Sequence, residues 1–223
     1  MVRANYLQEL SNIKRLVLDM GEKTTAAVLS AVESFTTNNA DAALRSRQLE
    51  KEVDVMFTDI DEQCIKTIAT QQPAATDLRF LISSIKIASE IERVADYANN
   101  IAKIVQKKFP KMERNAVESF SPQIAALGHL ALQMLSDAIK AYDTNDANLA
   151  SQVRERDAAV NQLNKTLLKD LLAAAVANPN LQEAVVEYHV AIRYIERVAD
   201  RSTNIAEWVF YIATGYRMKD KKA

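Results

Sequence analysis

Apolar side chains recur every three or four positions along most of this 223-residue chain. Between residues 87 and 105 the recurring positions are Ile87, Ile91, Val94, Ala98, Ile101 and Val105. This spacing is typical of an α-helix that buries one stripe of its surface against other helices. Helix breakers and capping residues divide the pattern, which predicts helices over residues 3–37, 40–72, 76–109, 122–143, 146–177 and 180–214. The clearest boundary is Ser121-Pro122, where we expect the serine to cap a helix that begins with proline.

The two halves of the chain are related by an internal repeat. The segment from Gly21 to Leu44 aligns without a gap with the segment from Gly128 to Ser151, and IERVAD at 91–96 recurs unchanged at 195–200. Duplication of a three-helix unit is the simplest account. The sequence therefore predicts an all-α fold of two tandem three-helix bundles, over residues 1–112 and 113–223, with residues 110–120 as the linker. Because glycine inside a helix costs about 1 kcal/mol relative to alanine, we expect a close helix approach or a bend at both Gly21 and Gly128.

Composition agrees with long helices and narrows the class of protein. With three glycines and four prolines, the chain has little turn chemistry for connecting many short strands. A net charge of -1 provides no general attraction for nucleic acid. A cytoplasmic protein is favoured by the single cysteine, Cys64, and by the absence of an apolar signal-peptide stretch. The longest apolar run, Leu171 to Ala177, is also short. Any contact with a membrane is expected to be peripheral, since spanning one takes roughly 20 apolar residues.

Oxygen-bearing side chains form a row on the repeated segment of the first unit. Residues four apart share one face of a helix, and the preceding helix carries an acidic pair with the same spacing. Glu50 lies as many positions before Pro73 as Asp96 lies after it, and the same holds for Asp54 and Glu92. In an antiparallel hairpin with equal rise per residue, the two pairs lie at the same height. The residues concerned are Glu50, Asp54, Glu92, Asp96 and Asn100.

The second unit repeats this arrangement with one acidic residue fewer. Counted from Pro179, the positions of its two pairs agree to within one, so they too lie at nearly the same height. The residues are Asp157, Asn161, Glu196, Asp200 and Asn204. Because Asn161 stands where the first unit has an aspartate, we expect a cation to bind more weakly here.

Two explanations account for these rows. Like charges four residues apart repel by a few tenths of a kcal/mol, so a compensating cation is expected. It is either a metal ion, for which clustered oxygen ligands suit a hard cation, or an arginine such as Arg93 or Arg197, or one elsewhere on the bundle. Neither His129 nor His189 completes a Glu-x-x-His motif, which argues against a ferritin-like di-iron oxidase. No glycine-rich phosphate loop or nucleophile motif is present.

Three segments of the chain are distinctive: QQPAATDLRF at 71–80, EIERVAD at 90–96 followed by Asn100, and the second IERVAD followed by Asn204. They give the chain a resemblance to the PhoU family, the regulators of bacterial phosphate uptake. The resemblance also includes DMGE at 19–22 and covers nearly the whole chain.

The resemblance implies a cytoplasmic, non-enzymatic negative regulator of phosphate uptake and of the starvation response. Such a protein links the ATPase of a phosphate ABC transporter to a sensor histidine kinase, and a homodimer is expected. Some members of the family carry multinuclear iron or zinc clusters on paired E(D)xxxD motifs. Carried over to this chain, the implied metal ligands are Glu50, Asp54, Glu92, Asp96, Asp157, Glu196 and Asp200, with Asn100 and Asn204 as auxiliary ligands. The ion itself stays open among iron, zinc, manganese and magnesium.

Two other functions are compatible with the residues alone. A carboxylate-bridged metalloenzyme would use the same acidic rows for redox or hydrolytic turnover. A purely structural helical bundle would keep them as ordinary surface charge.

Overall fold

The computed structural model of the chain describes residues 2–112 and 117–218. Within these ranges the structure contains six α-helices and three short 3-10 helices. The α-helices are α1 (Val2–Thr37), α2 (Ala40–Gln71), α3 (Ala75–Lys107), α4 (Ser121–Thr144), α5 (Ala147–Ala177) and α6 (Gln182–Thr214). The 3-10 helices are η1 (Phe109–Lys111), η2 (Glu118–Phe120) and η3 (Pro179–Leu181).

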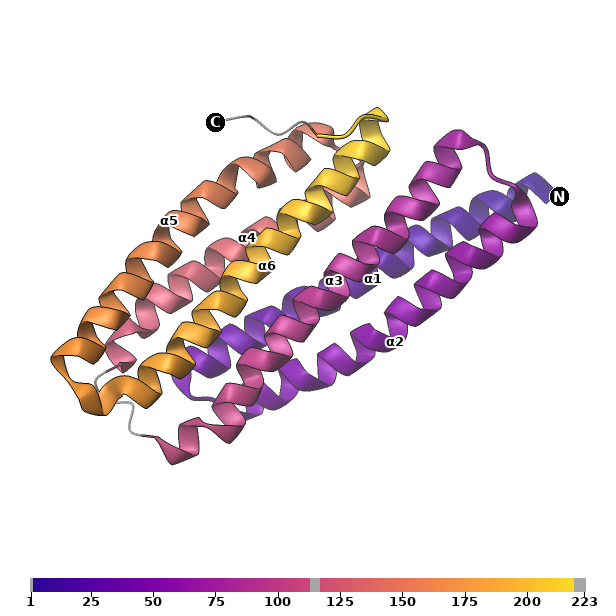
Figure 1. Ribbon diagram of the computed structural model, residues 1–223. Coiled ribbons are helices and arrows are strands. Elements are labelled where there is room, and N and C mark those ends of the chain that lie inside the picture. Colours follow the sequence, from indigo (N-terminus) through magenta and orange to yellow (C-terminus); the bar gives the residue numbers. More distant parts are fainter. Residues whose placement is uncertain (1, 113–116, 219–223) are drawn as a thin grey trace.

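The helices form two bundles that share a broad interface. Helices α1, α2 and α3 pack on one another, and so do α4, α5 and α6. The bundles are joined by α3 against α6 and by α1 against α4, whereas α2 and α5 lie at opposite outer sides (Figure 1). Buried apolar side chains make one cluster across both bundles. The predicted fold class is therefore confirmed. None of the described helices combines the length and the apolar character needed to cross a membrane.

The turn between the first two helices is built in the same way in both units. Asn38 and Asn145 adopt the left-handed backbone conformation, with φ of 55° and 52°. The next residue, Asn39 or Asp146, caps the following helix by accepting hydrogen bonds from two backbone N–H groups. Asparagine tolerates the left-handed region, and asparagine and aspartate are strong N-caps. Equivalent residues thus close the same turn twice.

The expected cap at Ser121 is wrong. Helix α4 begins at Ser121 itself, and no side chain caps it. The cause is η2, which ends at Phe120 and runs directly into α4, so that Ser121 already has helical φ and ψ of -54° and -40°. Helix α3 likewise ends two residues before the expected position, and α6 starts two residues after it, because the 3-10 helices η1 and η3 occupy these ends.

The connection between the units is anchored at both sides of residues 113–116, which lie outside the described residues. Phe109 and Val117 are both buried. The ring of Phe109 lies 5.0 Å from that of Phe35 and 6.0 Å from that of Tyr188, measured between centroids. The expected domain boundary between residues 112 and 113 falls at the edge of the undescribed segment and stays a prediction.

Gly21 and Gly128 mark the crossing of α1 and α4. A β-carbon placed on Gly21 would lie 2.8 Å from Cδ1 of Ile139, and one on Gly128 would lie 2.7 Å from Cγ1 of Val32. These two contacts are counterparts under the repeat, and they show that α1 and α4 run antiparallel. The close helix approach expected at both glycines is confirmed.

Candidate metal centre

The acidic residues of the first unit lie on the facing helices α2 and α3. Glu50 is the most deeply placed, with 8% of its surface exposed. Loss of solvent raises the pKa of Glu50, Asp54 and Glu92, and in each case the negative charge of Asp96 raises it further. Charges from α2 and α3 thus act on one another across the two helices, as expected for acidic pairs at similar heights.

A chain of side-chain hydrogen bonds holds Glu50 in place. Asn99 donates from Nδ2 to Oε1 of Glu50, and its own Oδ1 accepts a bond from Nε of Arg47 at 3.3 Å. Arg47 also donates to Gln106. Asn100, the expected auxiliary ligand, instead accepts from Nζ of Lys103 at 3.3 Å. Sequence reasoning missed Asn99, although its position two helical turns after Glu92 places it on the same helix face.

No lysine or arginine of the described chain forms an ion pair within 4.0 Å with Glu50, Asp54, Glu92 or Asp96. The positive charge of Arg93 lowers the pKa of Glu92, but the guanidinium does not reach ion-pair distance. The arginine explanation of the acidic row therefore does not account for the first unit.

In the second unit, arginines do pair with the acidic row. Nη1 of Arg193 lies 2.6 Å from Oε2 of Glu196, and Arg197 donates from Nη1 to Oδ2 of Asp200 at 3.1 Å. Asp157, opposite on α5, accepts from Nδ2 of Asn161 at 2.8 Å. Loss of solvent and then the charge of Asp200 raise the pKa of Asp157. Two of the three acids of the second unit thus have an arginine partner, whereas Oδ1 of Asp157 and Oε2 of Glu196 are buried without a hydrogen-bond partner.

Asn204 joins the two bundles. It donates from Nδ2 to Oε2 of Glu90 on α3 at 3.2 Å, and Arg201 forms an ion pair with the same oxygen at 3.1 Å. Under the repeat, the counterpart of Glu90 and Arg201 is the pair Tyr194 and Tyr97, whose rings stack with centroids 5.8 Å apart. The same pair of repeat positions thus forms a charged contact on one occasion and an aromatic contact on the other, and both contacts join α3 to α6.

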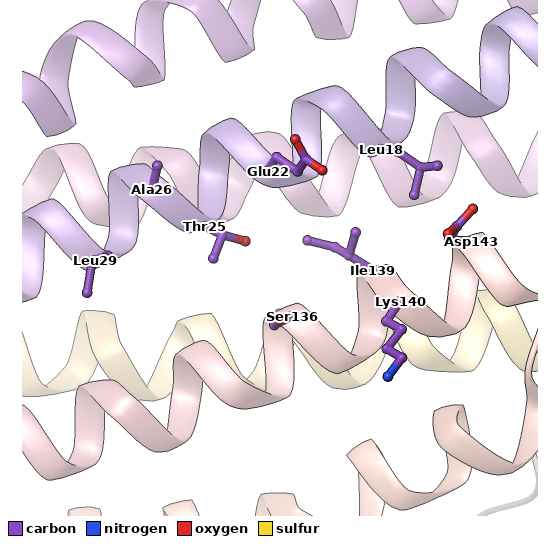
Figure 2. A pocket seen from close by; sticks show the side chains of 9 residues that line it. All are labelled: Leu18, Glu22, Thr25, Ala26, Leu29, Ser136, Ile139, Lys140 and Asp143. Atoms are coloured by element: carbon purple, nitrogen blue, oxygen red, sulfur yellow. The ribbon is translucent and has the colours of Figure 1, made fainter.

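Two surface hollows border the α1–α4 crossing and the second acidic row. The first, of about 510 Å³, lies between α1 and α4. Figure 2 shows that Ile139 reaches from α4 toward α1, whereas Lys140 points away from α1. This hollow contains none of the candidate metal ligands. The second, of about 280 Å³, has a mixed-charge lining of Asp157, Arg197, Asp200, Arg201, Thr203 and Asn204.

The first unit has the donor chemistry for a hard cation. Carboxylate and amide oxygens suit magnesium, manganese and iron, whereas zinc sites usually include histidine or cysteine. As the side chains stand, no three His, Cys, Asp or Glu residues of the described ranges are arranged to hold a metal ion. Binding therefore requires rotation of these carboxylates toward a common centre. Glu50 is already fixed by Asn99, while Asp54 is exposed.

These observations define a duplicated, all-helical two-bundle protein with acidic rows on facing helices of each unit. The chain belongs to the PhoU family, since the PhoU domain model matches residues 17–105 and 124–209. It is 31% identical over 207 residues to the phosphate-specific transport system accessory protein PhoU of Edwardsiella tarda, covering 93% of this chain and 84% of that protein.

Solved structures support the same assignment. The crystal structure of PhoU from Pseudomonas aeruginosa superposes with a TM-score of 0.88 at 29% identity, covering 95% of this chain and 100% of that one. The phosphate transport system regulatory protein PhoU from Streptococcus pneumoniae matches in fold, with a TM-score of 0.81 at 24% identity, covering 96% and 99% of the two chains. The relatives are named accessory and regulatory proteins rather than enzymes, in agreement with the non-enzymatic role predicted from the sequence.

Proposed function

We propose that this protein restrains phosphate uptake and the phosphate-starvation response, as a cytoplasmic adaptor between a phosphate ABC transporter and a sensor histidine kinase. The observation that carries the proposal is a likeness to phosphate-transport accessory proteins that extends over nearly the whole chain and both bundles. The proposed partners are the ATPase subunit of the transporter and the kinase, and the cytoplasmic location follows from them.

The first unit is proposed to bind metal through Glu50, Asp54, Glu92 and Asp96. The supporting observation is a cluster of four carboxylates without an ion-pair partner in the described chain, in which burial and the charge of Asp96 raise the pKa of Glu50, Asp54 and Glu92. A bound cation would neutralise this charge and fix α2 against α3. The hydrogen bond from Asn99 already orients Glu50. Asn100 would supply a further oxygen ligand if its hydrogen bond with Lys103 were broken. The remaining expected ligands, Asp157, Asn161, Glu196, Asp200 and Asn204, are proposed to bind metal more weakly.

A homodimer is part of the proposal. Leu44, Val55 and Ile65 expose 49%, 63% and 55% of their surfaces along the outer helix α2, and these apolar side chains are candidates for the contact. Light scattering coupled to size-exclusion chromatography tests it. A mass of one chain at all micromolar concentrations would contradict the dimer.

The regulatory role is tested in cells that lack this protein. Removing it should raise the rate of radiolabelled phosphate uptake in phosphate-rich medium, and returning the wild-type chain should restore the low rate. Crosslinking in the restored cells should capture the transporter ATPase and the kinase. An unchanged uptake rate, or capture of neither partner, would contradict the proposal.

Asp54→Asn combined with Asp96→Asn tests whether the acidic cluster is needed for this role. The matched control is Asp59→Asn, which neutralises an exposed aspartate on the same helix α2. The double variant should fail to restore low uptake, and the control should restore it.

A further inference from the structure

The segment that follows α6 folds back onto the last turns of this helix and places an arginine on two aromatic rings. Gly215 ends α6 in the left-handed backbone conformation, with φ of 81°, which turns the chain away from the helix axis. Cζ of Arg217 then lies 4.0 Å from the ring centroid of Trp208 and 4.5 Å from that of Tyr211. Both distances lie well within the range of a cation–π interaction.

A second arginine, Arg79 of α3, lies near the same rings but is held by the fold. Its Cζ lies 5.6 Å from the ring centroid of Tyr211. A β-carbon on Gly215 would collide with Nη1 of Arg79, so this guanidinium packs directly against the end of α6. A cation is favourable there, because the C-terminus of a helix carries a partial negative charge. Arg79 is half-buried whereas Arg217 is exposed, so Arg217 is the cation that can leave the rings.

The repeat does not require aromatic residues at these two positions. Trp208 corresponds to Ile104 of the first unit, and Tyr211 corresponds to Lys107. Ile104 is buried, so the first unit completes its core at this level with an aliphatic side chain. Trp208 and Tyr211 are only half-buried, and their rings meet edge to face with centroids 6.2 Å apart. Tryptophan and tyrosine, like arginine, are enriched among the residues that dominate the binding energy of protein–protein interfaces.

The rings are the sole partners of the Arg217 guanidinium among the described residues, where it forms no hydrogen bond and no ion pair. A cation–π contact at an exposed site shifts an equilibrium by about two- to fivefold, so two such contacts hold Arg217 by on the order of tenfold. The contact is therefore weak enough to be exchanged.

We propose that Trp208 and Tyr211 form a docking site for an arginine side chain of a partner protein, and that Arg217 occupies this site in the free chain. The internal occupant shows which chemistry the rings accept, namely a planar guanidinium, which stacks on aromatic faces as the ammonium of lysine does not. A partner arginine that brings further contacts displaces Arg217, which acts as a built-in competitor. The inference goes beyond the proposed function and does not depend on the metal site.

The test titrates the full chain with a capped hexa-arginine peptide and follows the fluorescence of Trp208, the only tryptophan of the chain. Calorimetry gives the affinity independently. Arg217→Ala removes the internal occupant, so hexa-arginine should bind on the order of tenfold more tightly than it binds the wild type. Hexa-lysine carries the same charge, and its affinity should rise by less than about threefold. Circular dichroism and the melting temperature check that each variant folds.

Two further variants separate docking from a general effect of charge. Arg15→Ala removes one positive charge from an exposed arginine of α1 and should leave the affinity for hexa-arginine within about threefold of the wild type. Arg217→Ala combined with Trp208→Leu removes both the occupant and the larger ring. Calorimetry should show that this double variant loses the tenfold gain.

Three results would overturn the inference. Equal gains for hexa-arginine and hexa-lysine, or equal gains in Arg217→Ala and Arg15→Ala, would show that net charge alone is responsible. An unchanged affinity in Arg217→Ala would show that the contact only holds the end of the chain in place. None of these results bears on phosphate uptake or on metal binding, so the inference can fail while the proposed function stands.

Discussion

Replacing Gly128 by alanine perturbs the crossing that fixes the two bundles relative to one another. In an open helix this change would stabilise the protein by about 1 kcal/mol, because glycine is the poorer helix former. Here the new methyl group would lie 2.7 Å and 2.8 Å from the two γ-carbons of Val32. Val32 is buried, with 6% of its surface exposed, and as a β-branched residue it is restricted at χ1. The methyl group can therefore be accommodated only by a shift of the helices.

Overpacking of this kind costs about 1 to 3 kcal/mol. Set against the gain in helix propensity, Gly128→Ala should lower the free energy of unfolding by about 1 kcal/mol, with a range of about 0 to 2. For a chain of this size the melting temperature should fall by about 2 to 4 °C. Urea unfolding followed by circular dichroism measures the difference. A variant stabilised by about 1 kcal/mol would refute the close crossing.

The pseudo-symmetric change Gly21→Ala is the matched comparison. Its β-carbon would lie 2.8 Å from Cδ1 of Ile139, a side chain that is partly buried and borders the hollow between α1 and α4 (Figure 2). Because Ile139 can rotate into that hollow, Gly21→Ala should be close to neutral. An equal loss of unfolding free energy in Gly21→Ala and Gly128→Ala would contradict this reasoning.

Three further predictions concern single residues. In chelator at pH 7, Asp96→Asn should stabilise the protein by about 0.5 kcal/mol or more, because it removes a like-charge repulsion. The raised pKa values of Glu50 and Glu92 mean that the folded wild type gains stability as the pH falls from neutral toward 4.5. Asp96→Asn should reduce that gain, and urea titrations at several pH values measure it. Glu90→Ala should cost about 1 to 3 kcal/mol in the same assay, because the partly buried Arg201 loses its acceptor; a neutral effect would contradict the role of this contact. The buried thiol of Cys64, with its pKa raised to about 12, should react with a thiol reagent only after unfolding, and rapid labelling of the native chain would contradict its burial.

The fold follows from sequence wherever one local signal dominates. The helical period and the turn residues Asn38 and Asn145 give each helix to within two residues. The failure at Ser121 has a physical cause, because a 3-10 helix and an α-helix differ little in backbone angles. A serine-proline pair therefore does not reveal that a 3-10 turn precedes the helix.

The pairing of the bundles was less accessible from the sequence. The equivalent glycines predict a close approach, but they do not say that the partner is the other unit rather than a neighbouring helix. Glu90, Arg201 and Asn204 meet across α3 and α6 from positions that lie far apart in the sequence. No local spacing reveals such a contact.

The acidic rows were found from spacing, whereas their partners were not. Turn counts place Glu50 level with Asp96 because helical rise per residue is nearly constant. Whether an arginine reaches a carboxylate depends on rotamers and on the neighbouring helix, so the difference between the units emerged only from the structure. Asn161 predicts a weaker second site through the loss of one negative charge, and Arg193 adds a further difference of one positive charge.

The central proposal is that the first unit binds metal and that the second, in which arginines pair with Glu196 and Asp200, binds it more weakly. Its most direct test is the amount of manganese retained after loading and dialysis, measured by mass spectrometry on the wild type, Glu92→Gln and Glu196→Gln. Glu92→Gln should lose the bound metal, and Glu196→Gln should retain as much as the wild type. Loss of metal from Glu196→Gln with full retention in Glu92→Gln would contradict the assignment.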